Sequence, residues 1–230
     1  MVSHKHKCIF VHIPKTGGET ITSLFEDNDS NIPKHANARQ IKEYLGEKVW
    51  SEYFKFTVVR NPYDLVVSMY SHLRKPIYKK EEIISKYGKA ILNPINACKT
   101  ACENNFNVYC EEVFFNNQIQ VEQFRDQWSV FHFQPQMDWI TNKDEEIIVD
   151  FIIRFENFNQ DFLNVIKKLK LNIKEIPCEN KSAHKHYSKY YSANELEIIS
   201  KHYSKDIKQF NYSFSDEKNF FDKFKILFRK

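Results

Sequence analysis

The feature that most constrains the fold is a short apolar run, residues 7–13 (KCIFVHI), which ends at Pro14. Unbroken apolar runs of this length are typical of strands that are buried on both faces in a parallel sheet. The next residues, 14–20 (PKTGGET), contain two consecutive glycines and lead into a stretch with helical character. A strand, a glycine loop and a helix in this order place backbone N–H groups around one point, which is the geometry of a phosphate or sulfate site.

Strand-like and helix-like segments alternate along the rest of the chain. Further strands are predicted at 54–60 and 148–155, and helices at 19–27, 37–46, 61–73, 157–169 and 192–210. Asn37 and Asn61 are predicted N-caps, Ser192 or Asn194 caps the last helix, and Gly46 stands where a helix would stop. The alternation predicts an α/β fold, three-layered and P-loop-like, with a central, mainly parallel sheet flanked by helices.

The organisation of the chain favours one domain. We find no internal repeat, low-complexity tract or linker, and the chain contains only 4 glycines. We therefore expect residues 1–230 to form a single domain. Residues 75–130 are predicted to form helices and long loops that make a lid or wall for the substrate.

Composition excludes several classes of protein. Hydrophobic residues make up 42% and charged residues 28%, as in a soluble globular protein, and a net charge of +4 is too small to indicate nucleic-acid binding. No apolar run approaches the roughly 20 residues of a membrane span, and the first ten residues lack the apolar core of a signal peptide, so we expect a cytoplasmic location. Five cysteines without a CxxC pair predict reduced thiols and no metal site.

The glycine loop differs from the common nucleotide loops. A Walker A loop places its lysine and hydroxyl after the glycines, whereas Lys15 precedes Gly17 and Gly18. The dinucleotide pattern GxGxxG is also absent. An ordinary strand-to-helix turn with a solvated Lys15 remains the alternative.

A second segment points to a second anion site. Arg60 ends the strand at 54–60, and Ser68 lies about two turns into the following helix. The carboxyl ends of strands in open α/β sheets face the ligand, and a guanidinium with a hydroxyl can hold a phosphate. Two such sites suggest a nucleotide with phosphates at both ends, although a structural ion pair between Arg60 and Asp64 would explain the same residues.

These two segments carry a resemblance to a known family. HIPKTGGET (12–20) resembles the 5′-phosphosulfate loop of sulfotransferases, and VVRNPYDLVVSMY (58–70) resembles their 3′-phosphate motif. The likeness is closest to carbohydrate sulfotransferases of the Golgi type and their soluble bacterial relatives. It covers most of the chain and is weakest at 75–130. No amino-terminal membrane anchor is seen, so the Golgi setting is not carried over.

The resemblance implies a donor, 3′-phosphoadenosine-5′-phosphosulfate (PAPS), a product, PAP, and no required metal. Lys15 would stabilise charge on the departing phosphate, and Arg60 with Ser68 would bind the 3′-phosphate. The 5′-phosphate would be held by the loop residues that follow Lys15, namely Thr16, Gly17, Gly18, Glu19 and Thr20.

The resemblance also implies a catalytic base, His35. Histidine titrates near neutrality, which suits removal of a proton from a sugar hydroxyl. The alternative is that His35 is an exposed loop residue beside Lys34. His12 is a competing base, although its place in the first strand makes it a wall residue of the substrate site.

Two further segments are candidate ligand contacts. Lys185 and Tyr187 could touch the adenine and 3′-phosphate, or belong to a solvated loop. Gln136 and Trp139 could contact a sugar, or pack in the core.

The sequence thus predicts a sulfotransferase that acts on a hydroxyl, of a carbohydrate or glycolipid. Two other functions remain open, an ATP-dependent P-loop-type phosphotransferase and a non-catalytic module that binds PAP or another nucleotide. Neither the acceptor nor the oligomeric state is indicated.

Overall fold

The computed structural model describes residues 1–74, 97, 100–116, 133–173, 176 and 184–215. The chain divides into two compact units, Met1–Arg60 with His132–Lys181 and Asn61–Phe131 with Ser182–Lys230. The prediction that the whole chain forms one domain stays a prediction.

The first unit contains a four-stranded sheet in the order β1-β2-β3-β4. Its strands are β1 (Val2–Ser3), β2 (Cys8–Val11), β3 (Phe54–Val59) and β4 (Phe151–Arg154). β2, β3 and β4 are parallel, while β1 pairs antiparallel with β2. The three predicted strands and the mainly parallel sheet are therefore confirmed. β1 was not predicted, because two residues are too few to show a periodicity.

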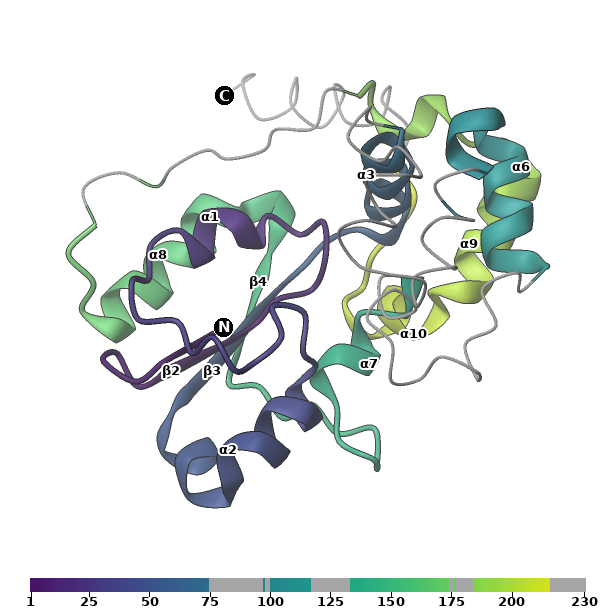
Figure 1. The fold of residues 1–230 in the computed structure, drawn as a ribbon. Coiled ribbons are helices and arrows are strands. Elements are labelled where there is room, and N and C mark those ends of the chain that lie inside the picture. Colours follow the sequence, from purple (N-terminus) through teal and green to yellow (C-terminus); the bar gives the residue numbers. More distant parts are fainter. Residues whose placement is uncertain (75–96, 98–99, 117–132, 174–175, 177–183, 216–230) are drawn as a thin grey trace. The chain divides into compact units, whose positions relative to one another are not determined.

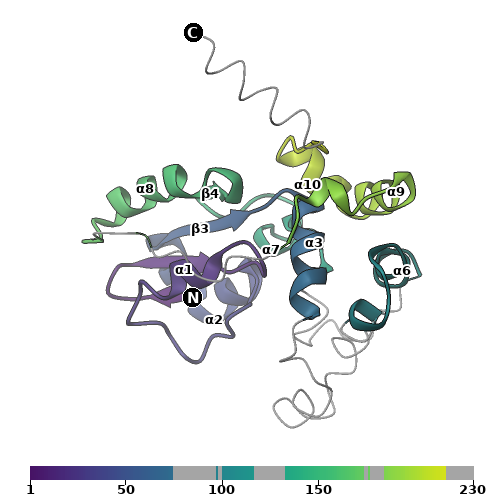
Figure 2. The same cartoon turned by 90° about the horizontal axis from the view of Figure 1, so that it is seen from above.

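Helices cover both faces of this sheet. Figures 1 and 2 show α1 (Gly18–Thr22) and α8 (Phe158–Leu169) over one face and α2 (Ala38–Glu52) against the other. Two short elements complete the unit, α7 (Met137–Ile140) and the 3-10 turn η5 (Phe155–Asn157). The predicted three-layer α/β fold is confirmed.

The core of the first unit lies between the sheet and the pair α1 and α8. Phe10 and Phe56 are opposite each other in the β2–β3 register, and their ring centres are 5.2 Å apart. Ile153 from β4, Ile21 from α1 and Phe162 from α8 are buried in the same cluster. Burial of these side chains fixes where β2 and β3 end, and hence where the residues after them lie.

The helix α2 begins as the sequence predicts. Asn37 Oδ1 accepts a hydrogen bond of 2.9 Å from the Gln40 backbone N–H, and Gln40 Oε1 accepts one of 2.9 Å from the Asn37 backbone N–H. This reciprocal pair satisfies two backbone donors at the start of the helix. Gly46 leaves the helix with φ 75°, but helical structure resumes and continues to Glu52, so the predicted stop is a kink.

The predicted helix at 19–27 is shorter in the structure. α1 ends at Thr22. The hydroxyls of Thr22 and Ser23 donate to the backbone oxygens of Glu19 and Thr20, at 3.1 Å and 3.0 Å. Side-chain bonds of this kind compete with the backbone ladder of a helix, and the chain continues as a loop.

The second unit is helical. It contains α3 (Pro62–Leu73), α6 (Phe106–Cys110), the π-helical segment η2 (Glu111–Phe115), η6 (Tyr187–Lys189), α9 (Ala193–His202) and α10 (Ser204–Gln209). The predicted cap of α3 is confirmed, since Asn61 Oδ1 accepts a hydrogen bond of 3.1 Å from the Tyr63 N–H. The single helix predicted at 192–210 is two helices that meet at Tyr203.

Aromatic rings pack against one another among the described residues of the second unit. The ring centres of Tyr70 and Phe106 are 5.3 Å apart, and those of Tyr70 and Tyr109 are 5.1 Å apart. Within the region predicted as a substrate wall, the described residues 97 and 100–116 are mostly helical, and the rest lies outside the described residues. In the part of the chain that the structure describes, no helix is long and apolar enough to cross a membrane. The predicted cytoplasmic location stays a prediction.

Candidate active site

The loop after β2 has an unusual backbone. Lys15 has φ 64° and Gly17 has φ 85°, so both adopt the left-handed conformation, with Thr16 between them. Turns that mix left-handed and right-handed residues turn successive N–H groups toward one side, which suits an anion. Thr16 is buried, and its hydroxyl donates a hydrogen bond of 2.8 Å to the Ile13 carbonyl oxygen, which closes the loop on itself. The backbone of the loop is therefore compatible with the predicted anion site.

The two glycines of this loop are required for different reasons. A Cβ on Gly17 would lie 3.2 Å from the Phe155 ring, and its φ of 85° disfavours other residues. A Cβ on Gly18 would lie 2.2 Å from the His12 ring, which no side chain can tolerate. The first glycine thus allows the turn, and the second makes room for His12.

The helix that follows the loop is short. With five residues, α1 provides a smaller helix dipole than a long helix would. Glu19 lies in the first turn of α1 and forms an ion pair with Lys34. Thr20 is buried in the same helix. The predicted contacts of Thr16 to Thr20 with a phosphate stay predictions.

Arg60 lies at the end of β3 and reaches the loop. Because β2 and β3 are adjacent and parallel, their carboxyl ends meet at the same edge of the sheet. Arg60 Nη1 donates a hydrogen bond of 2.9 Å to the Lys15 carbonyl oxygen, and the guanidinium carbon lies 4.1 Å from the centre of the Phe155 ring. The structure therefore brings together the two cationic residues, Lys15 and Arg60, that the sequence assigned to an anionic ligand.

Phe155 is a site residue that sequence analysis missed. It follows β4 directly, as Arg60 follows β3, and its ring touches both Gly17 and Arg60. It is the last residue of the strand predicted at 148–155, and this place at a strand end was the available signal.

Gln136 is completely buried and holds the backbone of Arg60. The Arg60 N–H donates to Gln136 Oε1 at 2.8 Å, and Gln136 Nε2 donates to the Arg60 carbonyl oxygen at 2.8 Å. Trp139, one turn further along, has an exposed fraction of 1%. The predicted sugar contacts of these two residues stay predictions, and their burial favours the alternative of core packing.

His35, the predicted base, has a defined tautomer. Its Nδ1 lies 3.0 Å from the carbonyl oxygen of His12. A carbonyl oxygen only accepts, so Nδ1 carries the proton and the lone pair of the neutral ring lies on Nε2. This is the arrangement in which a histidine can take up a proton from a substrate.

The environment of His35 also determines its charge. Burial lowers the pKa of His35 from 6.5 to about 4, and the positive charge of Lys34 acts in the same direction. The hydrogen bond to His12 and the negative charge of Glu19 raise the pKa and only partly offset the effect of burial. The ring is therefore neutral at pH 7.

His12 connects this base with the anion loop. It has an exposed fraction of 2%, and its ring centre lies 4.5 Å from that of His35 and 5.3 Å from that of Phe10. Because the edge of the ring with Cδ2, Nε2 and Cε1 lies next to Gly18, His12 is in contact with both the loop and the predicted base. The two candidate bases are thus neighbours, and His12 is the buried one.

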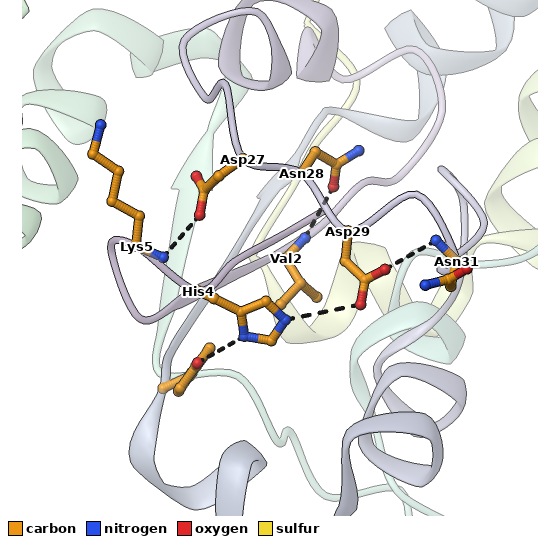
Figure 3. Close-up of polar contacts among 8 residues, drawn as sticks. Val2, His4, Lys5, Asp27, Asn28, Asp29 and Asn31 are labelled. Atoms are coloured by element: carbon orange, nitrogen blue, oxygen red, sulfur yellow. Dashed lines mark hydrogen bonds and ion pairs between the residues drawn. The ribbon is translucent and has the colours of Figure 1, made fainter.

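The loop that carries His35 is attached to β1 and to the residues directly after it. Figure 3 shows the Val2 N–H donating to Asn28 Oδ1 at 3.2 Å and the Lys5 N–H donating to Asp27 Oδ2 at 2.8 Å. In the same view His4 Nε2 lies 3.8 Å from Asp29 Oδ2. These contacts anchor the start of the loop, and the cap of α2 anchors its end, so His35 is held between two attachments.

The remaining predicted residues belong to the second unit. Ser68 is buried in α3. Tyr187 is also buried, and its hydroxyl accepts a hydrogen bond of 3.0 Å from the Ser215 N–H, whereas Lys185 is exposed. Their predicted contacts with a nucleotide stay predictions. Among the described residues there is no group of three or more His, Cys, Asp or Glu side chains that could hold a metal ion.

Fold and site together form an α/β unit with a lysine loop and an arginine at the ends of adjacent parallel strands. Comparison with known families agrees, because the model of the sulfotransferase family matches residues 1–213. The chain belongs to the sulfotransferase family. Searches of curated proteins and of solved structures found no match.

Proposed function

We propose that the protein transfers a sulfuryl group from PAPS to a hydroxyl of a carbohydrate or glycolipid, and releases PAP and a sulfate ester. The observation that carries the proposal is the hydrogen bond of 2.9 Å between Arg60 Nη1 and the Lys15 carbonyl oxygen. It holds two cationic residues at neighbouring strand ends, as a nucleotide with phosphates on both sides of its ribose requires.

The anion loop suits the 5′ side of such a donor. When bound, PAPS supplies an activated sulfuryl group on its 5′-phosphate. The backbone N–H groups after Lys15 bind that phosphate, and the ammonium group of Lys15 stabilises the charge that develops as the sulfur–oxygen bond breaks. Donors already in place for such charge contribute on the order of 100-fold each to the rate.

Arg60 suits the 3′ side. Its side chain is buried and its orientation is fixed by Lys15 and Phe155, so little conformational entropy is lost when a phosphate binds. Ser68 joins Arg60 at the 3′-phosphate in this proposal, on the strength of the sequence resemblance. Lys185 and Tyr187 are further proposed nucleotide contacts on the same basis.

His35 suits the acceptor side. As the acceptor oxygen bonds to sulfur, Nε2 of His35 takes up the hydroxyl proton, and the electron pair of the broken bond stays on the 5′-phosphate. A pKa of about 4 makes His35 a weak base in the free protein. A bound polyanion beside the loop raises this pKa, because nearby negative charge favours the protonated ring.

The alternative functions fit less well. The Walker A loop of P-loop phosphotransferases places a lysine, followed by Ser or Thr, directly after its last glycine, whereas here Glu19 follows Gly18 and Lys15 precedes both glycines. A module that only binds PAP has no need of a half-buried, neutral histidine with its lone pair on Nε2.

Thermal unfolding with PAP, and separately with ATP and magnesium, tests the proposal. A ligand at 100 times its dissociation constant adds about 2.7 kcal/mol to the free energy of unfolding. We expect PAP alone to raise the melting temperature. A rise only with ATP and magnesium would reject the donor assignment. Transfer of labelled sulfate from PAPS to a panel of sugar acceptors then distinguishes an enzyme from a binding module.

A further inference from the structure

Gln136 forms a reciprocal pair of hydrogen bonds with the backbone of Arg60. Its amide accepts from the Arg60 N–H and donates to the Arg60 carbonyl oxygen, both at 2.8 Å, although the two residues are 76 positions apart. We infer that Gln136 is a positioning residue for the donor, which acts by fixing Arg60 where the 3′-phosphate binds. This inference rests on the proposed function.

The position of Arg60 explains why such a residue is needed. The last residue of β3 is Val59, which pairs with Arg154 of β4, and Arg60 comes one step later. A neighbouring strand normally supplies a pair of hydrogen bonds to each alternate residue of a sheet. Gln136 supplies an equivalent pair to Arg60, so the backbone keeps a fixed direction one residue beyond the sheet.

The hydrogen bonds between Gln136 and Arg60 allow only one orientation of the Gln136 amide. A backbone N–H only donates and a carbonyl oxygen only accepts, so the oxygen and nitrogen of the Gln136 amide are assigned by their partners. Glutamine is the uncharged side chain of this length that offers both groups. Aspartate, glutamate and methionine each lack at least one of them.

The other end of Arg60 is fixed separately. Its guanidinium donates to the Lys15 carbonyl oxygen and lies on the Phe155 ring. With Gln136 at the backbone, the arginine is held at both ends. A guanidinium recognises a phosphate through a planar array of donors, so a small displacement of the backbone lowers affinity.

A purely structural role for Gln136 is the competing explanation. Buried polar groups that satisfy each other stabilise a core whatever the protein binds. The two roles differ in what a substitution changes. A structural role affects every ligand and the melting temperature alike, while a positioning role affects the 3′-phosphate selectively and only when Arg60 is present.

The test uses the full chain with Gln136→Met, which keeps the side-chain length and removes both hydrogen bonds. The control is Gln134→Met, a change of the same kind two residues earlier. Calorimetry gives the dissociation constants of PAP and of adenosine 5′-phosphate, which lacks the 3′-phosphate. We expect Gln136→Met to weaken the binding of PAP about 10-fold or more and that of adenosine 5′-phosphate by less than about 2-fold. Gln134→Met should leave the binding of both nucleotides unchanged.

The same substitution in an Arg60→Ala background completes a double-mutant cycle between Gln136 and Arg60. In that background Gln136→Met should weaken the binding of PAP by less than about 2-fold, because its effect depends on the Arg60 side chain. An equal effect in both backgrounds, or an equal loss for both nucleotides, would overturn the inference. If Gln136→Met does not fold, Gln136→Asn replaces it, since its amide is kept but is too short to hold both Arg60 groups.

The wild-type protein separates this inference from the proposed function. If the wild type binds PAP and Gln136→Met binds it equally well, only the positioning role of Gln136 is overturned. Absence of PAP binding by the wild type rejects the proposed donor, and the positioning role with it.

Discussion

Arg60 Nη1 donates a hydrogen bond of 2.9 Å to the carbonyl oxygen of Lys15. The bond joins the end of β3 to the loop after β2, where Lys15 has φ 64°. The charge of Arg60 thus helps to hold the left-handed turn of the loop. The two residues assigned to opposite ends of the donor depend on each other for position.

Loss of Arg60 should therefore affect both halves of the donor site. We expect Arg60→Ala to weaken PAP binding on the order of 100-fold, because a bidentate phosphate partner and the tie to Lys15 disappear together. Arg39→Ala, an exposed arginine on α2, is the control and should leave binding unchanged. Calorimetric titration with PAP measures both. Equal affinities for the two variants would contradict the assignment of Arg60.

Lys15 should contribute more to catalysis than to binding. Its charge is needed most when the leaving phosphate gains charge, so Lys15→Met should lower kcat by about 100-fold or more and weaken PAP by less. Initial rates with saturating PAPS and an identified acceptor measure the change. Lys48→Met, on the exposed side of α2, is the matched substitution and should keep full activity. A Lys15→Met variant with normal kcat would remove Lys15 from the mechanism.

Gly18 should tolerate no side chain while His12 is present. A Cβ would lie 2.2 Å from the His12 ring, so Gly18→Ala should lower the free energy of unfolding by about 1–3 kcal/mol, as overpacking of a core does. Urea denaturation measures this. In a His12→Ala background, which lacks the ring, the same Gly18→Ala change should cost much less.

Gly46→Ala serves as the comparison for backbone strain. Gly46 also has positive φ, but no atom of the described residues lies within 4 Å of the place that a Cβ would take, so the cost should stay near ~1 kcal/mol. If Gly18→Ala were as stable as the wild type, the close packing of His12 on the loop would be disproved.

His35 should make stability fall as the pH drops. Burial lowers its pKa in the folded protein to about 4, against 6.5 in the unfolded chain. Between these values the unfolded chain binds the proton and the folded protein does not. The contribution of neutral His35 to the free energy of unfolding is therefore fully present above pH 6.5 and is lost as the pH falls toward 4. The loss is at most on the order of 3 kcal/mol.

A glutamine at position 35 isolates this contribution. His35→Gln removes the titrating group, so its free energy of unfolding should decline less steeply than that of the wild type between pH 6.5 and 4. Parallel curves for the wild type and His35→Gln would show that His35 is not buried as neutral imidazole.

The same pKa predicts the pH dependence of catalysis. If His35 is the base, kcat/KM should keep its value well below pH 6.5 and fall only near pH 4, the pKa of the free protein. His35→Gln should lower kcat by about 100-fold or more with PAP binding nearly unchanged. A rate that halves near pH 6.5 would point to a solvent-exposed histidine instead.

Elements with local causes could be predicted from the sequence. The apolar runs at 54–60 and 148–155 became β3 and β4, and the caps at Asn37 and Asn61 formed as expected. Helix caps and buried strands depend on neighbouring residues, so short segments are enough to find them. The parallel order of the strands then placed Lys15 and Arg60 at one edge.

The surroundings of those residues are properties of the packed molecule and could not be predicted. Gly18 is a glycine because of His12, and Arg60 is held by Gln136 from 76 positions away. The low pKa of His35 follows from burial. Burial, the choice of a histidine tautomer and contacts between distant segments depend on where the whole chain comes together, and no short stretch of sequence contains that information.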